Sequence, residues 1–286
     1  MYLKKIILVL FFFLLLFMSF IITDKVSNMI KDKDELMHII KDKASSYTIN
    51  PIDGIYTQTT FIPGINGRIV NINKSYNAMK KYGVFSNSLL VFKEVKPNNT
   101  LNDNYDKYII GGNINKKMVS IIFLVHKEDD IRDILNLLHQ KNVRANFFVD
   151  GFFLENNSNL ISDITSLENI IGNLGYNGNY LDPSYIWMDT LIKKLGKQKK
   201  GYCYLEKEND DYLKLCAANK NYTIIPNLIL NHNFLSNIKK NLKNGMIVAL
   251  DINNELKEEI GIIIDYILSK GYTLDNLDVL LSEKSL

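Results

Sequence analysis

One stretch, residues 119–151, limits the folds open to this chain, because two apolar runs flank a single amphipathic segment. Residues 119–125 (VSIIFLV) are almost wholly apolar, as a strand buried on both faces requires. In residues 131–138 the hydrophobic positions recur every three or four residues, which predicts a helix that ends near Asn142. Residues 143–149 form a second apolar run. Two strands joined by so short a crossover pair in parallel, and the crossover is almost always right-handed.

The loops that follow these strands are the first places to look for a functional site. In α/β folds, sites form at the carboxyl ends of parallel strands. His126 follows the first strand, Asp150 follows the second, and Asp251 ends a third apolar run near the C-terminus. We expect all three side chains near one mouth of the sheet.

Four segments, in the right order, resemble the polysaccharide deacetylase (NodB-homology) family. Residues 144–151 (RANFFVDG) resemble its second strand, and residues 170–176 (IIGNLGY) its EIGNHTY segment. Residues 245–251 (GMIVALD) resemble its GxIILLH strand, and residues 263–281 its last helix and strand. The similarity covers about residues 118–284. It implies an α/β fold: a distorted or incomplete parallel (β/α) barrel with helices outside.

The same resemblance implies a domain without the family's known catalytic set. Family members are metal-dependent hydrolases of N-acetyl groups on glycans. They use two aspartates after the first strand, two histidines after the third and one histidine after the last. The matching positions here are Leu124, Val125, Leu174, Gly178 and Asp251. A hydrolytic metal needs about three protein ligands and an open position for water. We therefore expect a catalytically degenerate domain with no catalytic residue, metal ligand or cofactor.

The alternative is an active metal-dependent deacetylase whose metal ligands lie at other positions. His126, Asp150 and Asp251 would then hold a zinc-like divalent metal, and the chain would be a divergent glycan or peptidoglycan N-deacetylase. Otherwise His126 is a solvated loop residue and Asp251 caps the helix that follows it. Whether the chain is an enzyme stays open on the sequence alone.

A polar loop after the third strand is a candidate glycan-binding segment. Sugars are held by amide hydrogen bonds and aromatic faces. The candidates are Asn173, Tyr176, Asn177 and Tyr180. Asn is also an ordinary turn residue, so a purely structural loop is the alternative. We expect Trp187 to be a core or helix-packing residue rather than a sugar platform. Cell-wall polysaccharide or a wall protein is the expected partner.

The first residues indicate export. Lys4 and Lys5 precede residues 6–22, an apolar run without charge that is long enough to span a bilayer. No A-x-A cleavage pattern follows, which favours an uncleaved signal-anchor over a removed signal peptide. The positive-inside rule then places the amino terminus in the cytoplasm and the rest of the chain outside the cell.

Three parts are predicted from these features. Residues 1–23 form a cytoplasmic tip and transmembrane anchor. Residues 24–117 form a juxtamembrane helix and a small α/β leader segment, and residues 118–286 form the deacetylase-like domain.

The net charge and the cysteine count indicate which partners and disulfide bonds to expect. The net charge of +3 is too small to indicate nucleic acid binding. Two cysteines imply no disulfide framework. Cys203 and Cys216 could form a disulfide bond in an exported protein, but we expect buried free thiols.

Overall fold

The computed structural model describes residues 6, 10–21, 33–180 and 183–285. The chain divides into two compact units. One comprises Met1–Asn50 and Gly67–Val95, and the other comprises Pro51–Asn66 and Lys96–Leu286.

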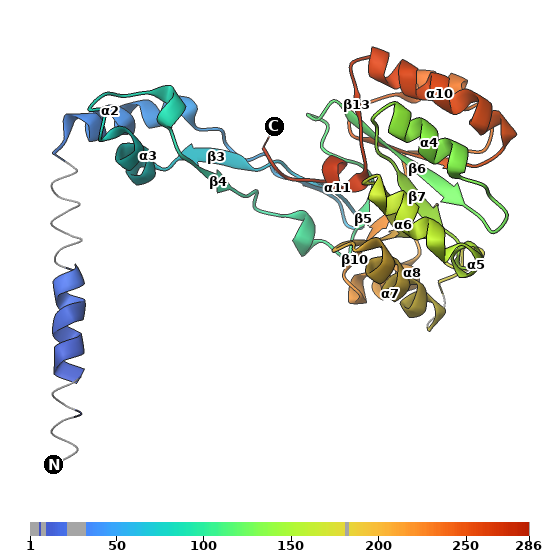
Figure 1. Ribbon diagram of the computed structural model, residues 1–286, viewed down its shortest axis with the longest axis horizontal. Helices are drawn as coiled ribbons and strands as arrows, with labels where there is room; N and C mark the ends of the chain where they lie inside the picture. The colour runs from blue at the N-terminus through green and yellow to red at the C-terminus, as the bar shows by residue number, and fades with distance from the viewer. Residues whose placement is uncertain (1–5, 7–9, 22–32, 181–182, 286) are drawn as a thin grey trace. The chain divides into compact units, whose positions relative to one another are not determined.

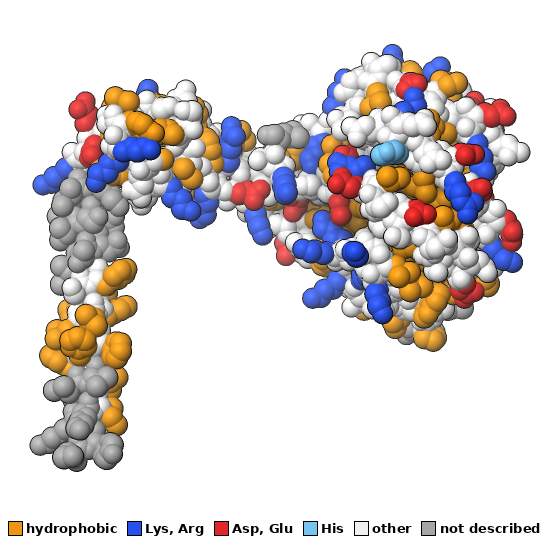
Figure 2. Space-filling model, viewed as in Figure 1, with side chains coloured by type: hydrophobic (Ala, Val, Ile, Leu, Met, Phe, Trp, Pro, Cys, Tyr) orange, Lys and Arg blue, Asp and Glu red, His pale blue; other side chains and the backbone are white. Residues whose placement is uncertain are grey.

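The predicted membrane anchor lies partly outside the described residues, which omit residues 7–9 and 22. Residues 10–21 are helical, and Figure 2 shows apolar side chains along this helix. No helix among the described residues combines the length and the hydropathy needed to cross a bilayer. The anchor therefore stays a prediction.

In the smaller unit, helices α2 and α3 accompany a two-stranded antiparallel sheet. Helix α2 (Glu35–Ala44) begins at Asp34, whose carboxylate accepts a hydrogen bond from the backbone N–H of Leu36 and another, 2.7 Å long, from the Tyr76 hydroxyl. The remaining elements are β3 (Gly67–Val70), α3 (Ile72–Met79) and β4 (Phe92–Val95), with 3₁₀ turns at Ser45–Tyr47 and Asn87–Leu89. Residues 25–32 of the predicted juxtamembrane helix lie outside the described residues.

The larger unit is built around the strand–helix–strand unit that the sequence predicts. Strand β6 (Met118–Val125), helix α4 (Arg132–Gln140) and strand β7 (Asn146–Val149) follow one another, and the two strands pair in parallel. This prediction is confirmed. On its other side β6 pairs in parallel with β12 (Met246–Asp251).

These strands belong to one curled sheet. Its other strands are β1 (Ile55–Tyr56), β2 (Thr60–Ile62), β5 (Tyr108–Ile109), β8 (Ile170–Asn173), β9 (Gly201–Tyr204), β10 (Asn221–Ile224), β11 (Leu228–Leu230) and β13 (Thr273–Leu274). The order is β1-β2-β5-β10-β9-β8-β7-β6-β12-β11, with β13 beside β6. All pairs are parallel except β1–β2. The order has two free ends, so the sheet forms a half-barrel rather than a closed barrel.

Alternation along β6 separates the two faces of the half-barrel. Phe123 and Val125 belong to the cluster packed under the outer helices, whereas Ile122 and Leu124 belong to the inner cluster, closed by α11 (Leu277–Leu280). Figure 1 shows α4 and α10 outside the sheet. The outer helices are α4, α5 (Gly151–Asn156), α6 (Ser158–Ser166), α9 (Phe234–Asn241) and α10 (Asn254–Ser269).

A disulfide links β9 to the helix that follows it. Cys203 lies in β9 and Cys216 in α8 (Asp210–Ala218), and the two form a disulfide bond. The expectation of free thiols is wrong, because the fold brings the two Cα atoms within 6.5 Å, a distance that sequence spacing does not reveal. Helix α7 (Ser184–Gly196) covers the same corner, where the Tyr185 hydroxyl lies 3.4 Å from Cys203 Sγ.

Candidate functional site

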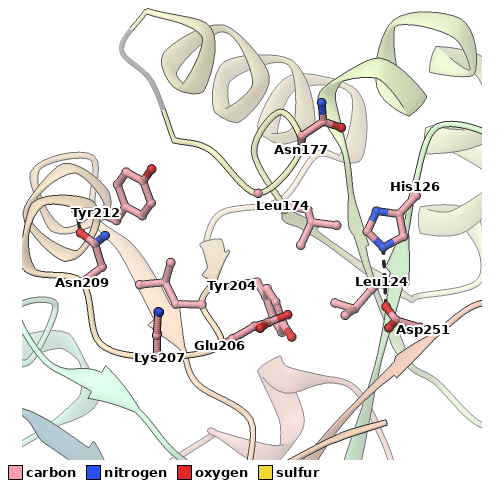
Figure 3. A pocket seen from close by; sticks show the side chains of 12 residues that line it. Leu124, His126, Leu174, Asn177, Tyr204, Glu206, Lys207, Asn209, Tyr212 and Asp251 are labelled. Atoms are coloured by element: carbon pink, nitrogen blue, oxygen red, sulfur yellow. Dashed lines mark hydrogen bonds and ion pairs between the residues drawn. The ribbon is translucent and has the colours of Figure 1, made fainter. Parts of the chain in front are cut away.

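A pocket of about 460 Å³ opens at the carboxyl ends of β6, β8, β9 and β12 (Figure 3). The carboxyl ends of parallel strands meet at one edge of a sheet, so residues distant in sequence converge here. The lining residues are Leu124, His126, Leu174, Asn177, Gly178, Tyr204, Leu205, Glu206, Lys207, Asn209, Tyr212 and Asp251.

His126 and Asp251 form a pair at the rim of this pocket. The Nε2 atom of His126 lies 3.6 Å from Oδ1 of Asp251, and the side chains are 56% and 36% exposed. Figure 3 shows the two side chains facing each other. The interaction with the Asp251 carboxylate raises the pKa of His126, although partial burial opposes the shift. The backbone N–H of His126 also donates to Asp129 Oδ2 at 2.7 Å, and burial raises the pKa of Asp129.

The floor of the pocket is apolar. Leu124 and Leu174 are almost completely buried and belong to the inner cluster of the half-barrel. The Tyr204 ring belongs to the same cluster and meets Phe148 edge-on, with 6.0 Å between the ring centroids.

Asp150 holds the loop between Asn173 and Tyr180 in place. Its side chain is buried and caps α5, accepting from the Phe152 N–H at 2.8 Å. The second carboxylate oxygen accepts from the Asn177 N–H at 2.7 Å. Both oxygens are therefore engaged by backbone groups.

Tyr180 links this loop to β9. Its buried hydroxyl lies 2.6 Å from the carbonyl oxygen of Asn173 and 2.8 Å from that of Tyr204, and it accepts from the Tyr204 N–H at 2.9 Å. This hydroxyl therefore fixes the backbone that carries the Tyr204 side chain.

This fold is similar to that of BA3943, a CE4 family pseudoenzyme from Bacillus anthracis. The two share 25% sequence identity with a TM-score of 0.66, over 89% of this chain and 97% of that one. The resemblance to the polysaccharide deacetylase family that the sequence indicates is therefore confirmed by similar solved structures. A BA3943 mutant, described as a pseudoenzyme with restored enzymatic activity, matches with 25% identity and a TM-score of 0.67, over 88% of this chain and 100% of that one.

More distant deacetylase-family structures share the fold. PdaA of Bacillus subtilis, a family 4 carbohydrate esterase, is 18% identical with a TM-score of 0.53, over 81% of this chain and 97% of that one. In sequence, the uncharacterized protein YlxY of Bacillus subtilis (strain 168) is 33% identical over 170 residues. That match covers 58% of this chain and 52% of YlxY, so the chain spans about half the length of this relative. No family model matches the sequence.

The residues at the deacetylase-family metal positions do not fit a metal. Leu124, Leu174 and Gly178 line the pocket, yet none of them has a metal-binding side chain. Val125 faces away from the pocket, into the cluster under the outer helices. Asp251 is the one donor at these positions. In the described part of the chain, no three His, Cys, Asp or Glu side chains are arranged to hold a metal ion.

The alternative set of deacetylase ligands is only partly assembled. The structure brings His126 and Asp251 together at the pocket, whereas Asp150 is buried and bound by backbone N–H groups. The sequence also suggests Asp251 as a cap for the helix that follows, and the structure shows otherwise. Asp251 lies in β12, and Asn253 caps α10.

One of the four predicted glycan-binding residues lines the pocket. This residue is Asn177; Asn173 and Tyr180 are buried beneath the loop. The Tyr176 hydroxyl donates to Glu155 at 2.7 Å, and burial together with this bond raises the pKa of Tyr176 to about 12. Trp187 does not lie in the core, which was one of the two expected positions: it belongs to α7 and is 44% exposed.

Several residues that line the pocket were not predicted as site residues from the sequence. Tyr204 ends β9, and Glu206, Lys207 and Asn209 lie in the charged loop that follows; Tyr212 comes from α8. A charge run is usually a solvated loop. The position of this loop, directly after a buried strand of a parallel sheet, is the feature that could have indicated a site.

Proposed function

We propose that this chain is a catalytically inactive polysaccharide deacetylase-like protein that binds cell-wall glycan through the pocket at the carboxyl ends of its strands. One observation carries the proposal. The pocket stays open where the family places its site, while Leu124 and Leu174 stand where the family's ligands would be. The domain therefore keeps a binding cavity and loses the donors that hydrolysis requires.

The lining suits a sugar. The amides of Asn177 and Asn209 provide planar hydrogen-bonding groups, and the rings of Tyr204 and Tyr212 provide aromatic walls. Pockets that combine an apolar surface with a few convergent polar groups are typical of small-ligand sites.

We further propose that the domain works outside the cell, held at the membrane by residues 6–22. The Cys203–Cys216 disulfide supports export, because disulfides persist in oxidising compartments. The charge-free apolar run after Lys4 and Lys5 supports the anchor. A wall protein is the alternative partner to wall glycan.

A second candidate function is a divergent metal-dependent glycan or peptidoglycan N-deacetylase. The contact between His126 and Asp251 favours it, since two of the three relocated donors already lie together. Asp150 would have to leave the backbone N–H groups of Phe152 and Asn177 to join a zinc-like ion.

Two assays separate these functions. The whole 286-residue chain is incubated with N-acetylated peptidoglycan and chitin oligomers, with zinc, cobalt or manganese supplied, and acetate release is measured. We expect no release above a metal-only blank, with an active family member run alongside. Metal-dependent release abolished by His126→Ala or Asp251→Ala would establish the second candidate.

Binding is tested by co-sedimentation with purified cell walls. Tyr212→Ala removes an aromatic wall of the pocket and is expected to weaken binding. Trp187→Ala is the matched control, because it removes an exposed aromatic side chain that does not line the pocket. Equal loss in both variants, or no sedimentation of the wild type, would contradict glycan binding at this site.

A further inference from the structure

We propose that the pocket selects glycan units that carry a free, protonated amino group over N-acetylated units; this rests on the glycan-binding function proposed above. The inference comes from the charges that line the pocket, from one unpartnered hydroxyl, and from the leucines at two of the deacetylase-family metal positions.

Two carboxylates face the pocket from separate elements. Asp251 ends β12, and Glu206 lies in the loop after β9. Glu206 has no ion pair within the described part of the chain, and His126 is the charged partner that the structure gives Asp251. An ammonium group offers several N–H donors and a positive charge to such a pair, whereas an acetamide offers one N–H and a carbonyl oxygen that carboxylates repel.

The hydroxyl of Tyr204 is the independent observation. The side chain is 5% exposed and lines the pocket, and within the described residues its oxygen has no hydrogen-bond partner. A buried polar group without a partner is uncommon and points to an absent one. Burial, and then the negative charges of Glu206 and Asp251, raise the pKa of this hydroxyl, so both carboxylates act on the same space.

The remaining lining is consistent with an amino sugar. Leu124 and Leu174 offer an apolar surface to a sugar ring. The cationic Lys207 also lines the pocket. Figure 3 shows it toward Asn209, whereas Glu206 lies toward Tyr204. The carboxylates of Glu206 and Asp251 therefore lie at the end of the pocket that holds Tyr204, where the ionisable imidazole of His126 pairs with Asp251.

The test compares two probes that differ in the acetyl group. Calorimetric titration of the whole chain with glucosamine oligomers and with N-acetylglucosamine oligomers of equal length, at low and moderate salt, gives both affinities. We expect the free-amine oligomers to bind about tenfold more tightly, with a preference that shrinks as salt rises.

Charge-neutralising variants locate the effect. Glu206→Gln and Asp251→Asn should each weaken binding of the free-amine oligomers by about tenfold and leave the N-acetylated oligomers unchanged. Asp211→Asn neutralises an exposed carboxylate that does not line the pocket, so it is the matched control and should not weaken binding of the free amine. Tyr204→Phe removes only the hydroxyl and should reduce affinity for the free amine, with unfolding curves used to confirm a folded chain.

The outcomes separate this inference from the proposed function. Equal or tighter binding of the N-acetylated oligomers overturns the amine preference and leaves glycan binding in place. Binding of neither oligomer, with no sedimentation on cell walls, overturns both. A preference that survives both carboxylate substitutions also overturns the inference, because the selectivity would then come from elsewhere.

Discussion

The imidazole of His126 and the carboxylate of Asp251 lie 3.6 Å apart at the ends of two paired strands, β6 and β12. The pair stabilises the charged imidazolium, and it raises the pKa of His126 above the ordinary value of 6.5. Because the folded pKa is raised, the pair's stabilising contribution is fully present below pH 6.5. It is lost as the pH rises through the folded pKa.

Titration by NMR tests this relationship. The His126 ring signal, assigned with His126→Gln, should titrate above pH 6.5 in the wild type. In Asp251→Asn it should move back toward 6.5, since the largest cause of the shift is removed. The unfolding free energy of the wild type should fall between pH 6.5 and the folded pKa, and this fall should shrink in the variant. A wild-type pKa at or below 6.5 would show that the pair does not form in solution.

The disulfide predicts a loss of stability on reduction. Cys203 and Cys216 are 13 residues apart in sequence, and a cross-link that closes a loop of this size restricts the unfolded chain. The double variant Cys203→Ala, Cys216→Ala is expected to lose about 3 kcal/mol of unfolding free energy, measured by chemical denaturation. A reductant should bring the wild type near the variant's level and leave the variant itself unchanged. Wild-type stability that does not respond to the reductant would rule out the bond.

Two glycines predict opposite effects of one added methyl group. A Cβ on Gly172, in β8, would lie 2.4 Å from the ring of Phe148, which is completely buried. Gly172→Ala should therefore lower the unfolding free energy by about 1–3 kcal/mol through overpacking. Gly261 lies inside α10, where the nearest atom, on Leu137, would be at 3.8 Å.

Gly261→Ala serves as the matched control for this overpacking. The added methyl group has room, and alanine favours the helix by up to about 1 kcal/mol over glycine. Denaturation curves of both variants should shift in opposite directions from the wild type. A shift of the same sign in both would contradict the packing described around Phe148.

Much of the fold was predictable because the spacing of apolar residues indicates which strands and helix faces are buried. Strand β6 is apolar along its length, and helix α4 repeats at helical spacing, so this unit follows from local rules. His126 and Asp251 were placed by the same logic, since both end strands of a parallel sheet. The half-barrel followed from the resemblance to the deacetylase family.

The rest depended on distances that no local pattern contains. The pairing of Cys203 with Cys216 needs the Cα separation, and the direction of Asp150 depends on the two N–H groups that it binds. Val125 faces the outer helices because side chains alternate along a strand. Matching Leu124 and Val125 to the family's two adjacent aspartates does not show that the two side chains point to opposite faces. Glu206 had the composition of a solvated loop and became a pocket residue only through tertiary structure.

Reintroducing family-type donors tests the assignment of the site. Leu124 and Leu174 line the pocket beside His126, so Leu124→Asp with Leu174→His would place about three donors around one cavity. We expect the double variant to bind zinc at least about tenfold more tightly than the wild type, and zinc to raise its thermal unfolding temperature.

Val125→Asp is the control for this prediction. Its side chain would enter the completely buried cluster under the outer helices, where an unpaired carboxylate costs several kcal/mol, so this variant should be destabilised and gain no zinc affinity. Zinc binding gained by Val125→Asp, or by neither variant, would mean that the pocket lined by Leu124 and Leu174 is not where the family's metal would sit. The contrast between two neighbouring residues on one strand thus decides which face of β6 carries the site.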